Sequence, residues 1–206
     1  VRAALVGSFV IPKALYACSA TSPSHKAMRK IRAACTRAVW GQANPWRAPE
    51  LIYTLLCRGH LADPRQAFAY SSFLVARRVL QRQPALWPMF QDVLLARQQS
   101  TARQHIGGPV ASLLRAGHIA NIDITRWDVL HFLDGANGQD LKEMDWLSPA
   151  LSRGQFQHIV RNSLRQEEWG TVSQRRASFY GMTYGVDRAA TLELHKQLGG
   201  LDRYEL

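Results

Sequence analysis

The chain has 206 residues, 47% of them hydrophobic, and it carries 26 lysines and arginines against 15 acidic residues, a net charge of +11. This hydrophobic content excludes a wholly disordered chain, and no apolar run approaches the roughly 20 residues that a membrane-spanning helix needs. Three cysteines (Cys18, Cys35 and Cys57) do not all pair, and no signal peptide precedes them, so we expect an intracellular protein in a reducing compartment. Their spacing matches no zinc site, and we expect buried thiols.

The positive charge is confined to the first half of the chain. Residues 1–100 carry 14 lysines and arginines against three acidic residues, a net charge of +11, whereas residues 101–206 carry 12 of each kind. Such an uneven distribution favours a polyanionic partner for the first half. A solvated basic surface without a partner is the alternative.

Helix signals begin at the N-terminus. Residues 1–20 are small and apolar with Pro12 in the middle, which predicts two short helical pieces or a helix after a bend. Ser22–Ser24 supplies a cap for a helix that runs to Trp40 and ends at Gly41.

Two further helices are expected before residue 84. One opens at Pro49 and closes at Gly59. The next begins at Asp63, an N-cap residue followed by Pro64 at the first helical position, and runs to about Gln83.

The second half is predicted to be helical around one β insertion. Helices are expected over residues 87–104, 110–116, 148–169, around 175, and 185–198. Interleaved apolar and polar residues from 118 onward, with turn dipeptides at 134–135 and 137–138, predict a strand or hairpin. The predicted fold class is mainly α, a helical bundle with a small β insertion near residues 118–143. We divide the chain into a basic region, 1–105, and a charge-balanced region, 106–206.

The helix after Ser24 separates charge from apolar side chains. On a helix that advances about 100° per residue, its cations fall within an arc of roughly 100°; they are Lys26, Arg29, Lys30 and Arg37. The opposite arc is apolar and comprises Met28, Ile31, Cys35 and Val39. We predict that the four cations contact nucleic-acid phosphates. Trp40 lies near the charged arc, where it either stacks on a base or packs against the next loop.

The helix after Asp63 shows a related pattern. One broad face is apolar and comprises Phe68, Phe73, Val75, Val79 and Leu80, while Tyr70, Leu74, Arg77 and Arg78 lie on the other. We predict Arg77 and Arg78 as a second phosphate-binding patch. Burial of this helix on two sides within the same bundle is the alternative.

Catalytic motifs are missing from the sequence. It contains no closely spaced aspartate pair, His-Glu-x-x-His, P-loop or Gly-x-Ser-x-Gly. We therefore predict no catalytic or metal-binding residues and no polymerase activity for this chain.

The opening stretch resembles one family. "IPKALY" at 11–16, followed by a basic helix that ends in "RAVWG", is similar to the segment after the palm in non-LTR (LINE-type) retrotransposon reverse transcriptases. The family pattern is roughly Leu/Ile-Pro-Lys-x-Leu-Tyr-Gly, and Ala17 replaces the usual glycine. "PELIYTLLCRGHLADPRQAFAY", "ARRVLQR", "WDVLHFLDG", "RRASFYG" and "YGVDRAATLEL" extend the resemblance over most of the chain.

The resemblance implies the thumb and connecting region of an RNA-directed DNA polymerase. Its partners would be RNA/DNA template-primer and the palm of its own polymerase, with no membrane, in the nucleus. The family's Tyr-x-Asp-Asp motif is absent, so we expect a fragment that needs no cofactor itself, although the whole polymerase would use Mg²⁺. A start at Val1 within an apolar run fits such a fragment. Two alternatives stay open: a free-standing helical nucleic-acid-binding module, and a helical protein-interaction scaffold.

Overall fold

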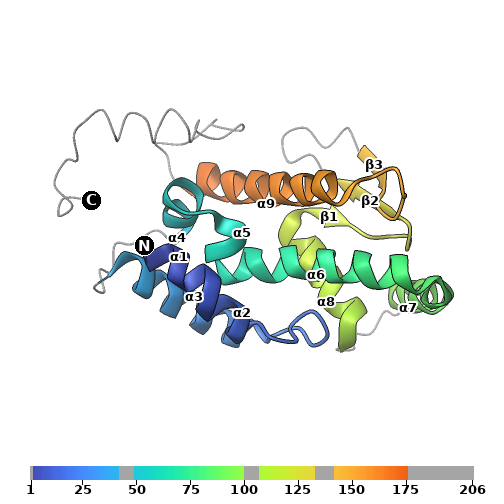
Figure 1. Cartoon of the computed structure of the whole chain (residues 1–206), viewed down its shortest axis with the longest axis horizontal. Coiled ribbons are helices and arrows are strands. Elements are labelled where there is room, and N and C mark those ends of the chain that lie inside the picture. Colours follow the sequence, from blue (N-terminus) through green and yellow to red (C-terminus); the bar gives the residue numbers. More distant parts are fainter. Residues whose placement is uncertain (1, 42–48, 100–106, 133–141, 176–206) are drawn as a thin grey trace.

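A computed structural model describes residues 2–41, 49–99, 107–132 and 142–175 (Figure 1). The N-terminal elements are α1 (Arg2–Leu5), the π-helical turn η1 (Val6–Val10), α2 (Ile11–Ala14) and α3 (His25–Trp40). The middle elements are α4 (Pro49–Leu51), η2 (Ile52–Leu56), α5 (Gly59–Ala62), α6 (Pro64–Arg82), η3 (Pro84–Leu86) and α7 (Trp87–Gln99). The last are α8 (Gly108–Ala120), β1 (Ile122–Asp123), β2 (Val129–Phe132), β3 (Lys142–Asp145) and α9 (Arg153–Arg175). The mainly helical fold class with a small β insertion is confirmed.

Local capping residues set the bounds of the two predicted helices α3 and α6. Ser24 Oγ accepts a hydrogen bond from Ala27 N (3.2 Å), and Gly41 ends α3 at φ 105°. At α6, Asp63 Oδ1 accepts from Arg65 N (2.9 Å). These bonds satisfy amides that have no partner within the helix, so both starts agree with the prediction.

Other bounds differ from the prediction. The helix from Pro49 ends at Leu56, because Cys57 takes an extended conformation, and Gly59 begins α5 instead of closing a helix. The helix α8 is longer than predicted. The helix α9 starts after Ser152, which exchanges hydrogen bonds with Gln155 in a capping box, and it continues unbroken to Arg175. The turn dipeptides at 134–138 and the helix predicted over 185–198 lie outside the described residues.

The β insertion is a three-stranded antiparallel sheet in the order β1-β2-β3. Leu130 pairs with Met144, and its side chain is fully buried. Trp127 precedes β2 and stacks on Trp87 of α7, with ring centroids 4.3 Å apart. The sheet is therefore part of the same packed body as the helices, and β3 extends two residues beyond the predicted insertion.

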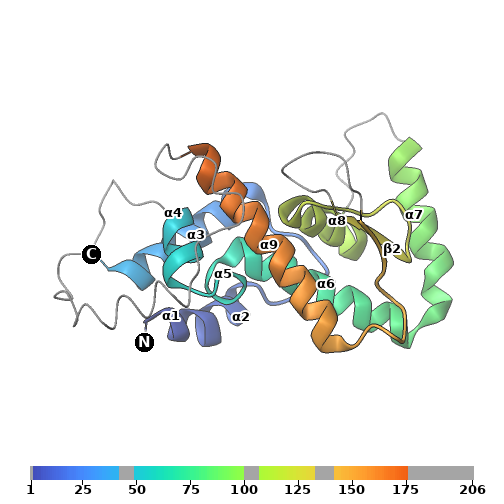
Figure 2. The ribbon, with the colours of Figure 1, turned by 90° about the horizontal axis from the view of Figure 1, so that it is seen from above.

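The helix α6 lies at the centre of the bundle, beneath α9 in Figure 1 and with α7 and α8 toward one end in Figure 2. Its buried side chains include Phe68, Phe73 and Leu80. Val75 and Val79, predicted on the same apolar face, are instead about 40% exposed. One hydrophobic core joins α6 with α8 and α9, so residues on both sides of the predicted boundary at 105 share it. None of the described helices is long and apolar enough to cross a bilayer.

Candidate nucleic-acid interface

The outer face of α3 carries all four of the predicted cations. Lys26, Arg29, Lys30 and Arg37 are all exposed. Within the described part of the chain, these four side chains form no ion pair or hydrogen bond. Between them lie exposed alanines, Ala33 and Ala34, whose short side chains leave the helix surface open.

The first helix adds a further cation at the end of α3. An ideal Cβ placed on Gly41 would lie 3.2 Å from Nη1 of Arg2, so this guanidinium is next to the C-terminus of α3. That position is favourable for a cation, because the last carbonyls of a helix carry partial negative charge. The basic surface therefore extends beyond the residues predicted from the helical pattern.

The inner face of α3 holds an ion network that the sequence did not reveal. Arg32 Nη2 donates to Glu168 Oε1 (2.9 Å), and Arg32 Nε donates to Asp63 Oδ1 (3.1 Å). The second oxygen of Asp63 lies 2.6 Å from Nη2, outside hydrogen-bond geometry. Asp63 is fully buried and Glu168 is 4% exposed. One arginine thus joins α3 to α9 and to the start of α6.

Burial dominates the protonation of this network. It raises the pKa of Glu168, and the nearby Asp63 raises it further, although Arg32 opposes both. Burial likewise raises the pKa of Asp63 against the effect of Arg32. Two carboxylates that share one guanidinium in a place of low polarity favour an extra proton between them.

Arg77 does not belong to the predicted second patch. Its side chain is 6% exposed, and its guanidinium donates to three backbone carbonyls, those of Trp146 (2.6 Å), Ser148 (3.5 Å) and Leu151. It also lies over the ring of Phe156, 4.8 Å from the centroid. These bonds attach α6 to the segment between β3 and α9, so a phosphate cannot reach this side chain. Its neighbour Arg78 is exposed.

Trp40 and Tyr70, two aromatic residues whose roles the sequence leaves undecided, are partly buried against hydrophobic clusters. Trp40 packs against a small cluster around Tyr53 and Cys57, which favours packing over base stacking. Tyr70 and Leu74 pack against the main core, so α6 is buried on two sides. The three cysteines are buried free thiols, as expected.

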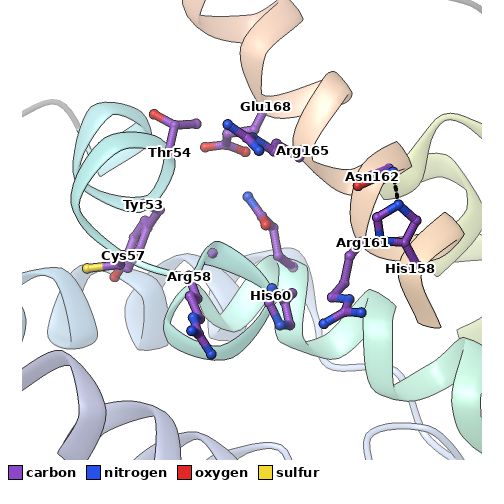
Figure 3. Close-up of a pocket in the computed structure, with 12 residues that line it drawn as sticks. Tyr53, Thr54, Cys57, Arg58, His60, His158, Arg161, Asn162, Arg165 and Glu168 are labelled. Atoms are coloured by element: carbon purple, nitrogen blue, oxygen red, sulfur yellow. Dashed lines mark hydrogen bonds between the residues drawn. The ribbon is translucent and has the colours of Figure 1, made fainter. Parts of the chain in front are cut away.

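A polar cavity of about 350 Å³ lies between the η2–α5 segment and α9 (Figure 3). Its lining includes three arginines and two histidines: Arg58, His60, His158, Arg161 and Arg165. Arg161, Asn162, Arg165 and Glu168 come from successive turns of α9. Figure 3 shows their side chains around one hollow, with Arg58 and His60 on the opposite side. We call this the basic cavity.

Sequence reasoning missed the basic cavity. Arg161 and Arg165 are four residues apart, which places them on one helix face. Arg58 lies far from them in the sequence and comes close to them only in the folded structure. Among the described residues, no group of three His, Cys, Asp or Glu side chains is placed to hold a metal ion.

A scan of protein-family models, a search of curated proteins and a search of solved structures each find no match for this chain. Its function is therefore inferred from the geometry and charge of these residues and from the sequence pattern.

Proposed function

We propose that this chain is the thumb and connecting region of a LINE-type reverse transcriptase and holds template-primer nucleic acid through phosphate contacts. The observation that carries the proposal is the outer face of α3, where four cations are exposed and without described partners. Four like charges on one helix face repel each other unless anions lie among them, and a phosphate backbone supplies such anions in a regular row.

The length of the α3 face suits a nucleic-acid strand. From Lys26 to Arg37 the helix advances about 16 Å, which matches roughly five steps of 3.4 Å along a duplex strand. The contacts would be to phosphates alone, and these carry no base information. The proposed binding is therefore independent of sequence.

The backbone at Ala17 supports the family assignment. The resemblance has glycine at this position, and Ala17 takes φ 61°, a left-handed conformation that glycine adopts without steric cost. The sequence pattern and the local backbone thus agree on what this turn requires.

Exposed apolar side chains in the N-terminal segment support the palm as a partner. Leu5, Phe9, Val10 and Tyr16 are between 47% and 86% exposed. Leu5 and Phe9 are four residues apart in continuous helical backbone and so lie near one another on one face, which suits an interaction with a partner protein better than scattered single residues would. We assign this surface to the palm and the α3 face to the nucleic acid, and we propose the nucleus as the location.

The test is a salt titration of binding to a fluorescent duplex and to an RNA–DNA hybrid. If each of the four α3 cations neutralises one phosphate, they supply about −3.6 to the slope of log affinity against log salt, at about −0.9 per contact. The variant K26Q/R29Q/K30Q/R37Q should lose this part of the slope equally on unrelated sequences. Its fold should survive, because the inner face of α3 is unchanged, and circular dichroism checks this.

A folded fourfold variant with the wild-type slope would place the interface elsewhere. Absence of salt-sensitive binding by the wild type would favour the protein-interaction scaffold.

A further inference from the structure

The basic cavity has a strong excess of positive charge. Arg58, Arg161 and Arg165 contribute guanidinium groups, and Glu168, the one carboxylate among the described lining residues, is bonded to Arg32 on its other side. A cleft with cationic walls concentrates anions. The charge of the basic cavity therefore favours a negatively charged ligand.

Two of the guanidinium groups retain donors for such a ligand. Arg161 uses Nε to bond its own helix at Gln157 O (3.1 Å), which fixes the side chain while its terminal nitrogens have no partner among the described residues. Arg58 precedes α5 on the opposite wall and has no partner within the described ranges. Arginine's planar fork matches the geometry of phosphate oxygens.

The remaining lining is polar and held in place. Asn162 Nδ2 and His158 Nε2 are 2.9 Å apart, one helical turn apart on α9. Gln66 lies against Gly59, where an added Cβ would overlap its side-chain amide, and it also bonds Glu168. These groups line one side of the cavity with hydrogen-bonding side chains.

The phenol ring that lines the cavity offers no exposed face on which a base could stack. Among the described lining residues, Tyr53 is the one aromatic residue besides the histidines. It is 1% exposed, and its hydroxyl lies 3.0 Å from Thr36 Oγ1. Base recognition by single-strand-binding proteins relies on exposed aromatic faces. Stacking on Tyr53 is therefore excluded, and the guanidinium groups of the lining favour recognition of a ligand through its phosphate.

We propose that the basic cavity binds a phosphate monoester at the 5′ end of a nucleic-acid strand. This inference rests on the proposed function, that the chain binds nucleic acid. A monoester carries a charge of about −1.5 to −2 and three acceptor oxygens, which suits arginines on opposite walls. An internal phosphodiester carries one charge and continues in both directions, so it suits the open face of α3 better than a cavity.

The test compares two single-stranded oligonucleotides that differ in a 5′-phosphate or a 5′-hydroxyl, each labelled at the 3′ end. We expect the full chain to bind the phosphorylated strand about tenfold more tightly, a factor that corresponds to about 1.4 kcal/mol. R161Q/R165Q should remove this preference and keep the salt slope that the α3 face supplies. Arg153 is exposed on the same helix away from the cavity, and R153Q is the matched control, which should keep both.

The competing outcomes are distinct. Equal binding of the two strands by the wild type, with salt-sensitive affinity retained, overturns the cavity assignment and leaves the proposed function intact. Competition by adenosine monophosphate or inorganic phosphate tests the source of the phosphate: displacement of the phosphorylated strand at equal concentration would overturn the assignment to a strand end.

A thermal-shift measurement with inorganic phosphate covers the case in which neither strand binds. That case overturns the proposed function and, with it, the assignment to a strand end. A rise in Tm for the wild type that R161Q/R165Q abolishes would then show that the cavity still binds phosphate.

Discussion

Arg32 of α3 donates to Glu168 of α9 over a distance of 2.9 Å, although the two residues are 136 positions apart in the chain. The same guanidinium is paired with the fully buried Asp63. The basic helix is therefore fixed on its inner side by an ion network, and its outer cations are left at the surface. The basic cavity borders this network through Glu168.

Replacing Arg32 with methionine should destabilise the protein by about 3–5 kcal/mol at neutral pH, because it leaves two buried carboxylates without their cation. The loss should be smaller at a lower pH, since burial raises the pKa of both carboxylates and the folded protein takes up their protons before the unfolded chain does. Urea unfolding at the two pH values measures this. The triple variant R32M/D63N/E168Q removes all the charges and should recover much of the loss. A deficit that is equal at both pH values would contradict the network's role.

The free energy of unfolding of the wild type should also depend on pH through this network. Burial raises the folded-state pKa values of Asp63 and Glu168 above those of the unfolded chain. The stability that comes from the raised pKa values is fully present at a pH below the unfolded-state pKa values of about 4. It is lost as the pH rises through the folded-state pKa values. Glu168→Gln should flatten this fall, as denaturation midpoints measured across the range will reveal. An unchanged profile would assign the dependence to other groups.

Arg77→Met should cost about 2–4 kcal/mol, because it removes charge-assisted hydrogen bonds to three carbonyls that hold the segment before α9. Arg78→Gln, one residue away and exposed, should change stability by no more than about 0.5 kcal/mol. Chemical denaturation compares the two. If Arg77→Met instead left stability unchanged and lowered the salt slope of binding, the phosphate role assigned to Arg77 from the sequence would be restored.

Ala17→Gly should stabilise the protein by about 1 kcal/mol, because alanine at φ 61° pays a steric cost that glycine avoids. The control is Ala34→Gly, at an exposed position inside α3, which should destabilise by about the same amount through loss of helix propensity. Thermal unfolding of the two variants should therefore shift Tm in opposite directions. A lower Tm for Ala17→Gly would show that the turn is not strained.

Two helical glycines should respond oppositely to alanine. At Gly117 of α8 an added Cβ would lie 2.5 Å from Ile122 O, a backbone atom of β1, so Gly117→Ala should cost about 1–3 kcal/mol. At Gly170 of α9 the same Cβ meets no described atom within 4 Å, and Gly170→Ala should stabilise by about 0.4–1 kcal/mol. Calorimetry of both variants decides whether β1 packs this closely on α8.

Sequence by itself determined the features that depend on neighbours within about four residues. The starts of α3 and α6 follow from Ser24 and Asp63, because a capping side chain bonds an amide two or three positions ahead. The outward cations of α3 follow from helical geometry in the same way, because every residue's angle is set by its position. The β insertion also came from a local pattern of alternating and turn residues.

The roles of individual arginines were decided by the tertiary structure alone. Arg77 and Arg78 are adjacent and look alike in the sequence, yet one bonds a carbonyl 69 residues away in the interior and the other faces solvent. The roles of Arg32 and of the arginines of the basic cavity likewise depend on the packing of α9. Partners so distant in the chain are brought together only when α6 and α9 pack. A local sequence pattern therefore does not predict which cation is buried, which is paired and which stays accessible to a ligand.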